Sequence, residues 1–353
     1  MKAESGEGEI GMAVSSGGRQ LNSNDPLFFD SFYRPQVWGG RGLNHLLGRP
    51  LAGDGPYGEA WELSSHSLHV STVVDGPNAG HSLSDLWASH RAELAGDCRF
   101  ESFPLLLKWL ECRELLSLQV HPNDSMARRI LNEPFGKSEA WVVIAADPSA
   151  VVYAGLKPGV TRNDVVQSIQ IGTLIDCLHS FTPTVGDCIS LPAGTIHAAG
   201  GGVMFAEVQQ TSDATFRLHD WNRMGLDGKP RALQVERGLD AVDWNQGPIN
   251  PVVPKEIKIG LAGVRAESLV TNLPFSLERY VIEGGMQAPH SGEMTIWMVL
   301  GGTAELKSPE SGFLRRLVQG ETTLFPSTAK PLVWQSTDES NPLTLLCARL
   351  ITL

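Results

Sequence analysis

The 353-residue sequence has no apolar run that approaches the ~20 residues needed to cross a bilayer, so we expect no membrane-spanning helix. It also has no excess of basic residues. The formal net charge is −11, which argues against general binding to nucleic acid or to an anionic membrane surface. An anionic substrate would therefore need local cations at its binding site.

Paired cysteines and a leader segment are missing as well. The five cysteines are odd in number and include no CxxC pair, which predicts buried, reduced thiols. The residues after Met1-Lys2-Ala3 are Glu, Ser and Gly, without the apolar core of a signal peptide. We therefore expect a cytoplasmic protein. The cysteines are Cys98, Cys112, Cys177, Cys188 and Cys347.

The chain shows little helical pattern and many short β-like runs separated by Gly and Pro, which indicates a mainly β protein. Residues 1–24 are rich in Gly, Ser and Asn and are predicted to be disordered. Residues 25–247 are predicted to form one domain with helical insertions, and residues 255–353 a smaller β domain. Helices are predicted at Leu83–Leu94, Arg162–Leu178 and Pro230–Val242. Strands are predicted at His69–Val74, Phe103–Leu110, Ser117–His121, Ala140–Ala145, Val151–Ala154, Cys188–Leu191, Val203–Gln209, Thr215–His219, Phe275–Ile282, Thr295–Leu300, Thr303–Leu306, Thr322–Phe325, Leu332–Trp334 and Leu343–Leu350.

Two polar strings predict the walls of a hollow barrel. In Ser117–His121, the polar residues Ser117, Gln119 and His121 alternate with Leu118 and Val120. Because a strand sends alternate side chains to opposite faces, the three polar groups share the inner face. The second string, Gly186-x5-Pro192-x-Gly194-x2-His197, delivers a histidine after a tight turn. The run Gly200–Gly202, which follows, is predicted to be a tight hairpin turn.

These strings supply donors that suit a zinc ion. His121 and His197 are the best imidazole candidates among the ten histidines; His290, in the C-terminal part, has no partner spacing. Glu139 immediately precedes an apolar run and is expected at the barrel mouth. Gln119 shares the strand face of His121 and offers a carbonyl oxygen. Two histidines, one glutamate and one glutamine could hold one Zn²⁺ and leave room for substrate.

Several segments, in this order and spacing, resemble the type I phosphomannose isomerases (mannose-6-phosphate isomerases) in their short bacterial form. The spacing of the second string also matches the second histidine motif of the cupin barrels. The resemblance implies a cupin-type (jelly-roll) barrel with helical insertions, followed by a cupin-like β domain. The segments are Trp38–Gly40, Gly58–Glu62, Phe103–Lys108, Leu116–Asp124, Gly136–Trp141, Leu191–Gly202 and Glu207–Arg223.

The resemblance also implies the ligands and the reaction. It assigns one zinc per chain to Gln119, His121, Glu139 and His197. The family reaction is the interconversion of mannose 6-phosphate and fructose 6-phosphate, which needs proton transfer between C1 and C2 through an enediol. A sugar phosphate is thus the expected partner.

Charged residues near these motifs are candidates for stabilising the enediol and holding the phosphate. Arg217 and Lys137 are assigned to catalysis because they add positive charge. Arg223 and Ser117 are assigned to substrate binding, since a guanidinium and a hydroxyl suit phosphate or sugar oxygens.

The general base stays open at this stage. Glu207 and His219 lie on expected inner faces, and Glu62 lies in a matching motif. Glu207 is placed with the catalytic residues, and it could instead support a ligand histidine. Glu62 and His219 are placed with the substrate-binding residues.

Two other functions use the same barrel. A cupin oxygenase would hold iron in a histidine-rich set of ligands. A sugar-phosphate sensor would bind ligand without turnover. Metal analysis with an oxygen-uptake assay, and a turnover assay on mannose 6-phosphate, separate the three.

Overall fold

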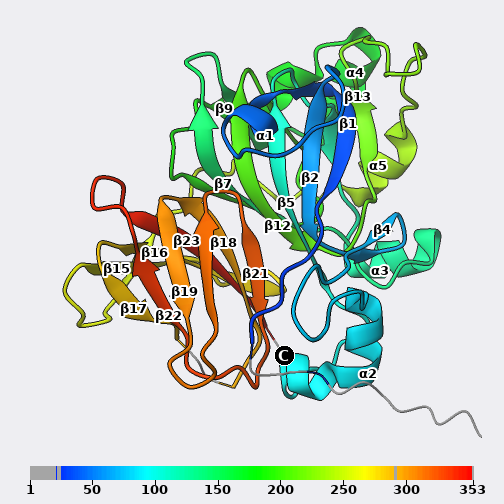
Figure 1. The fold of residues 1–353 in the computed structure, drawn as a ribbon. Coiled ribbons are helices and arrows are strands. Elements are labelled where there is room, and N and C mark those ends of the chain that lie inside the picture. Colours follow the sequence, from blue (N-terminus) through cyan, green and yellow to red (C-terminus); the bar gives the residue numbers. More distant parts are fainter. Residues whose placement is uncertain (1–20, 22–24, 290–291, 352–353) are drawn as a thin grey trace, which may run out of the picture.

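The computed structural model describes Leu21, residues 25–289 and residues 292–351 (Figure 1). The segment predicted to be disordered, residues 1–24, lies outside the described residues except for Leu21. The side chain of Leu21 is buried in a hydrophobic core. His290 also lies outside the described residues, so its expected lack of a metal role stays a prediction.

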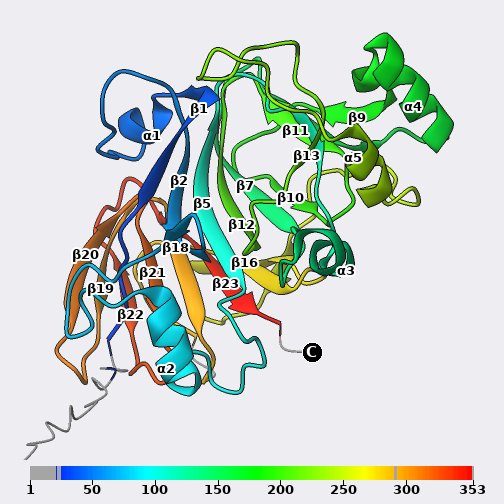
Figure 2. The same cartoon turned by 90° about the vertical axis from the view of Figure 1, so that its right-hand side faces the viewer.

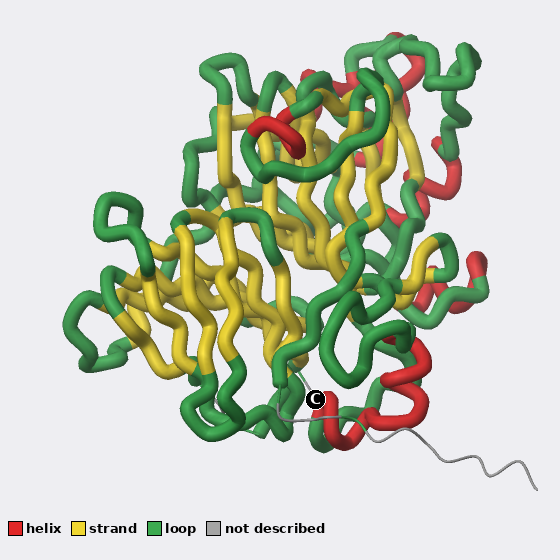
Figure 3. Tube along the Cα trace, in the orientation of Figure 1, coloured by secondary structure: helices red, strands yellow, loops and turns green. Residues whose placement is uncertain are grey.

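The described strands form four larger antiparallel sheets, with the helices at the periphery (Figure 3). Sheet 1 has the order β1 (Phe32–Gly40), β2 (Tyr57–Leu63), β5 (Leu105–Cys112), β12 (Val203–Gln210), β7 (Glu139–Ala146), β10 (Cys188–Leu191). Sheet 2 has the order β13 (Phe216–His219), β6 (Leu118–Val120), β11 (His197–Gly200), β8 (Val151–Leu156), β9 (Leu178–Phe181). The chain is therefore mainly β, as predicted.

The C-terminal part contributes the other two large sheets, and a short pair of strands forms a separate two-stranded sheet. Sheet 3 has the order β14 (Lys255–Ile257), β15 (Val264–Val270), β16 (Phe275–Ile282), β23 (Leu343–Leu350), β18 (Thr295–Gly301), β21 (Thr322–Phe325). Sheet 4 has the order β17 (Gly285–Gln287), β22 (Val333–Ser336), β19 (Thr303–Lys307), β20 (Leu314–Val318). The pair consists of β3 (Ser65–His66) and β4 (His69–Val70).

Sheet 1 is covered on both faces, and its strand alternation shows this directly. In β5, Leu105, Leu107 and Trp109 belong to a core shared with sheet 3, whereas Leu110 and Cys112 belong to a core shared with sheet 2. Figure 2 shows sheet 3 packed against the cyan and green strands of sheet 1. All eight residues of β5 are buried, which explains why the sequence reads as a nearly continuous apolar run.

Each of the three predicted helices is present, two of them shorter than predicted, and the described chain adds four short helical elements. Helix α2 begins after Ser82, whose side chain accepts a hydrogen bond from the Asp85 amide. The helix predicted at Arg162–Leu178 stops at Ile171 because Gly172 adopts a left-handed conformation and caps it. The predicted Pro230–Val242 helix covers only α5. The helical elements are α1 (Gly42–His45), α2 (Leu83–Ala95), α3 (Asp124–Met126), η1 (Ala127–Leu131), α4 (Arg162–Ile171), η2 (Leu174–Cys177) and α5 (Val235–Ala241).

Each predicted strand run overlaps a strand of the structure, but the sequence missed β1, β2, β3, β9, β14, β15, β17 and β20. Strand β1 carries Pro35 and ends in Gly39-Gly40, residues that normally interrupt strands. It can hold Pro35 because it is the edge strand of sheet 1 and its pairing shifts register there.

The predicted hairpin at Gly200–Gly202 is wrong in one respect. The turn is tight, with positive φ at Gly201 and Gly202, but the strands it joins do not pair with each other. Strand β11 lies in sheet 2 and β12 in sheet 1, so the turn crosses between facing sheets. An added Cβ at Gly201 would lie 2.2 Å from the Ser149 carbonyl oxygen, which leaves no room for a side chain.

The beginning of the described chain joins the C-terminal sheets. Leu27 exchanges backbone hydrogen bonds with Leu324 of β21, and Phe28 is buried in the core between sheets 3 and 4. The predicted division of the chain between residues 247 and 255 stays a prediction.

No helix in the described part of the chain is both long and apolar enough to span a membrane. All five cysteines lie within the described residues; each is buried and none forms a disulfide.

The shared core between sheets 1 and 3 predicts the effect of Leu277→Ala. Leu277 is fully buried there, so the cavity left behind should lower the free energy of unfolding by about 3 kcal/mol. Leu314→Ala is the matched control in exposed β20 and should cost less than about 1 kcal/mol. Denaturant unfolding followed by tryptophan fluorescence measures the free energy of unfolding of both variants. Equal losses in the two variants would contradict the stabilising role of Leu277 in the shared core.

Candidate metal centre and active site

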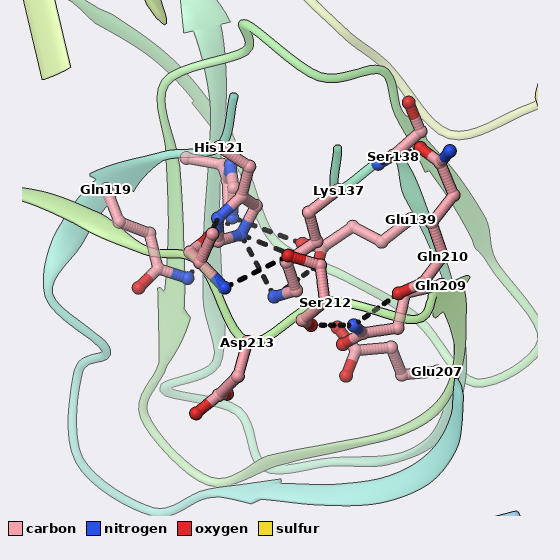
Figure 4. Close-up of polar contacts among 12 residues, drawn as sticks. Gln119, His121, Lys137, Ser138, Glu139, Glu207, Gln209, Gln210, Ser212 and Asp213 are labelled. Atoms are coloured by element: carbon pink, nitrogen blue, oxygen red, sulfur yellow. Dashed lines mark hydrogen bonds and ion pairs between the residues drawn. The ribbon is translucent and has the colours of Figure 1, made fainter. Parts of the chain in front are cut away.

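Three strand ends bring metal-binding side chains together between sheets 1 and 2. His121 follows β6, Glu139 begins β7 and His197 begins β11. Their potential ligand atoms all lie within 4.8 Å of one another, and the three residues are 2%, 0% and 1% exposed. Figure 4 shows His121 and Glu139 pointing toward each other from separate segments. Within the described residues this is the one cluster of three or more His, Cys, Asp or Glu side chains with such geometry.

Backbone carbonyls orient both histidines. The Nδ1 atom of His121 lies 2.8 Å from the Ala214 oxygen, and that of His197 lies 2.9 Å from the Thr195 oxygen. Because a carbonyl oxygen only accepts, each Nδ1 carries a hydrogen, and in the neutral ring Nε2 then keeps the lone pair. The two Nε2 atoms lie 3.5 Å and 3.1 Å from the Glu139 carboxylate. This arrangement, in which a second partner fixes the tautomer, is typical of metal-ligating histidines.

Electrostatics keep the cluster in the protonation state that a metal needs. Burial, and then the positive charge of Lys137, hold the pKa of His121 well below its usual value, so its ring is neutral. Burial alone would raise the pKa of Glu139, but Lys137 and His121 outweigh it and hold that pKa well below its usual value. The Lys137 Nζ atom lies 2.9 Å from Glu139 Oε2. The cluster thus offers the neutral imidazole of His121, the imidazole of His197 and one carboxylate.

Gln119 lies beside the cluster with its amide nitrogen, not its oxygen, toward His197. The distance between Gln119 Nε2 and His197 Nε2 is 3.3 Å, and Gln119 Oε1 accepts a hydrogen bond from Ser117. A half-turn of the side-chain amide exchanges the two atoms. The residue is therefore positioned to serve as a fourth, oxygen ligand.

The cluster adjoins a cavity enclosed by sheets 1 and 2. Five cationic and three acidic side chains line it, so the cavity is locally positive in a chain of net charge −11. This charge pattern suits an anionic ligand. The lining residues are Arg34, Gln36, Trp38, Glu59, Lys108, Leu110, Leu116, Ser117, Gln119, Lys137, Trp141, Glu207, Asp213, Thr215, Arg217 and Arg231.

A buried charge network forms the sheet 1 wall of this cavity. Lys108 Nζ lies 3.6 Å from Glu59 and 3.4 Å from Glu207, and Trp141 donates a hydrogen bond to Glu207. Burial raises the pKa of Glu207 to about 7, although Lys108 opposes this shift. For Glu59, Lys108 and Arg34 outweigh the effect of burial and lower the pKa to about 2. The buried Lys108 therefore pairs with two carboxyl groups, Glu59 and Glu207, whose pKa values differ.

Of the sequence-predicted residues, Ser117, Lys137, Glu207 and Arg217 line the cavity. Arg217 comes from β13, and its Nε atom is buried without a hydrogen-bond partner in the described structure. A guanidinium in this state has donor capacity left for a ligand.

Three predicted substrate-binding residues do not line the cavity. Glu62 faces the opposite side of β2, where it pairs with Arg49. His219 follows a register shift in β13 and its ring packs against Trp221. Arg223 is bound by Asp220 and by the Leu115 carbonyl. These positions do not support the predicted contacts with substrate.

The sequence analysis missed several lining residues. Arg34, Gln36 and Trp38 come from β1, a strand that was not predicted. Glu59 lies in a segment that was noted only for the resemblance, and Lys108 lies in a predicted strand but was given no role at the site. A lone lysine inside the apolar run of β5 was the available signal, since a buried lysine requires partners. Arg231 and Asp213 lie in loops, where no periodicity identifies them.

Comparisons with known proteins agree with this geometry. The family model for the phosphomannose isomerase type I catalytic domain matches residues 27–150. Mannose-6-phosphate isomerase of Streptococcus mutans is 32% identical over 311 residues, which is 88% of this chain and 95% of the relative. Mannose-6-phosphate isomerase ManA of Bacillus subtilis is 29% identical over 86% of this chain and 94% of the relative.

The similarity extends to a solved structure. The crystal structure of mannose 6-phosphate isomerase from Bacillus subtilis has a TM-score of 0.85 and 27% identity, and the match covers 93% of this chain and all of that chain. On these matches in sequence and fold, the chain belongs to the type I mannose-6-phosphate isomerase family, and it is an enzyme of that family.

Proposed function

We propose that this enzyme interconverts mannose 6-phosphate and fructose 6-phosphate with one zinc ion per chain. The observation that carries the proposal is the buried His121–Glu139–His197 cluster, which adjoins a cationic cavity through Gln119 and Lys137. Neutral imidazole and carboxylate donors suit zinc, and a fourth position from Gln119 completes a tetrahedral set. When bound, the ion polarises sugar oxygens as a Lewis acid.

The chain's own residues supply binding and charge. Arg217 and Lys137 add positive charge where the enediol develops negative charge, and Ser117 offers a hydroxyl to sugar or phosphate oxygens. Of the three candidates for the general base, Glu207 alone lines the cavity, so we assign it the proton transfer between C1 and C2. Trp141 and Lys108 hold its carboxyl group in place.

The proposed location is the cytoplasm. Five buried and unpaired cysteines suit a reducing compartment. A soluble sugar phosphate is the expected partner there.

The zinc assignment predicts the behaviour of His197→Ala. Loss of one imidazole should remove most bound metal and lower kcat/KM for mannose 6-phosphate by at least about 100-fold. His179→Ala is the matched control, because His179 hydrogen-bonds Asn250 away from the cluster. The measurements are metal content by mass spectrometry and a coupled turnover assay, with chelator and with zinc restored.

A His197→Ala protein with full metal content and full turnover would disprove the ligand set. Iron with oxygen uptake would favour the oxygenase, and binding without turnover would favour the sensor.

Arg217 is predicted to bind the substrate as it reacts. Arg217→Gln removes charged hydrogen bonds and should lower kcat/KM by about 10- to 100-fold while metal content stays unchanged. Arg91→Gln, at an exposed arginine of α2, is the control and should leave kcat/KM within about two-fold. Coupled assays measure both, and an unchanged Arg217→Gln enzyme would refute this role.

A further inference from the structure

A turn of the C-terminal part contacts the outer face of sheet 1 behind the cavity. The Gly320 carbonyl, between β20 and β21, accepts a hydrogen bond of 2.9 Å from the Trp109 indole and another from the Arg49 guanidinium. Gly320 has φ +94°, and an added Cβ would lie 3.0 Å from Leu47. Both the backbone conformation and the close approach therefore require glycine at this turn.

The same arginine neutralises a buried acid. Arg49 lies 2.5 Å from Glu62, and their side chains are 14% and 4% exposed. Ser31 donates a second hydrogen bond to Glu62. The other titratable groups facing this carboxyl are Tyr33 and Glu321. A carboxylate this deeply buried depends on its cation, since an unpaired buried charge is strongly destabilising.

Strand alternation connects this contact to the cavity. In β5, Trp109 faces the C-terminal turn and its neighbour Lys108 faces the cavity. In β2, Glu62 faces Arg49, whereas Glu59 and Trp61 lie on the other face, where Lys108 approaches both of them. Arg49 thus ties the back of β2 to the Gly320 carbonyl through Glu62, and Trp109 ties the back of β5 to the same carbonyl. The fronts of these two strands carry Glu59 and Lys108.

We propose that Arg49, anchored on the Gly320 carbonyl, is a positioning residue that sets Lys108 and Glu59 in the cavity wall. This inference rests on the proposed function for its kinetic readout. It gives the C-terminal sheets a role in the reaction: they supply a fixed acceptor against which β2 and β5 are aligned. Small displacements of positioned groups are enough to slow a reaction strongly.

The test compares Arg49→Ala with Arg279→Ala. Arg279 also bridges the two parts of the chain, since it donates to the Gly186 carbonyl and pairs with Glu267, but it contacts neither β2 nor β5. Arg49→Ala should lower kcat about ten-fold with KM and metal content little changed. Arg279→Ala should keep kcat within about two-fold. Equal kcat values for the two variants, measured below both melting temperatures, would overturn the proposal.

A double variant separates positioning from the effect of an unpaired buried charge. Burial raises the pKa of Glu62 to about 7 even beside Arg49, so its folded pKa lies above its unfolded value. Removing Arg49 raises the pKa of Glu62 further, so the free energy of unfolding of Arg49→Ala should fall as the pH rises from the unfolded towards the folded pKa of Glu62. Adding Glu62→Gln should abolish that slope but leave kcat low, because the link between β2 and the Gly320 carbonyl is still missing. Recovery of kcat in the double variant would contradict the proposal.

Hydrogen exchange provides a readout that does not depend on the substrate. Backbone amides of β2 and β5 should exchange faster in Arg49→Ala than in the wild-type protein. Their exchange rates should be unchanged in Arg279→Ala. If the wild-type enzyme fails to turn over mannose 6-phosphate, the proposed function is wrong, while this measurement still decides whether Arg49 aligns the two strands. Unaltered exchange in Arg49→Ala would reject the alignment itself.

Discussion

Neighbouring residues of β2, β5 and β12 face different environments because sheet 1 is covered on both sides. One face meets sheet 3 through an apolar core, and the other meets the cavity. A strand in this position has no solvent-exposed side, so each polar residue on it must find a partner within the protein. Lys108, Glu59 and Glu207 satisfy one another on the cavity face. The cavity's charge pattern is a consequence of this double burial.

The same constraint explains why the metal cluster lies at strand ends. Its three members are the residue after β6 and the first residues of β7 and β11, where side chains of both facing sheets converge. The carbonyls that orient the histidines come from the adjoining loops, at Ala214 and Thr195. Sheet pairing therefore sets the distances between donors, and loop backbone sets their direction.

The sequence predicted the donors better than their surroundings. His121 and His197 could be identified because alternation and a tight turn place them, and Glu139 because it immediately precedes an apolar run. None of these signals needs knowledge of the whole fold. Glu62, His219 and Arg223 were placed with the substrate-binding residues but do not line the cavity, because each placement depended on which face of a strand or loop met the cavity. In β13 a register shift separates Arg217 from His219, and no periodic pattern reveals such a shift. Strand β1 escaped prediction because its Pro35 is tolerated only at a sheet edge, and edge position is a property of the assembled sheet.

Glu62 shows how a residue within a family motif can serve the fold on one face while its neighbours serve the site on the other. The segment Gly58–Glu62 contains two acids of opposite orientation, and only Glu59 reaches the cavity. Both acids are buried and both pair with cations, but the cations come from different parts of the chain: Lys108 and Arg34 for Glu59, and Arg49 for Glu62. Because both acids belong to the short strand β2, we infer that the Glu62–Arg49 pair on one face influences the position of Glu59 on the other face. The distinction between a site residue and a scaffold residue therefore follows from strand parity, and the motif alone cannot make it.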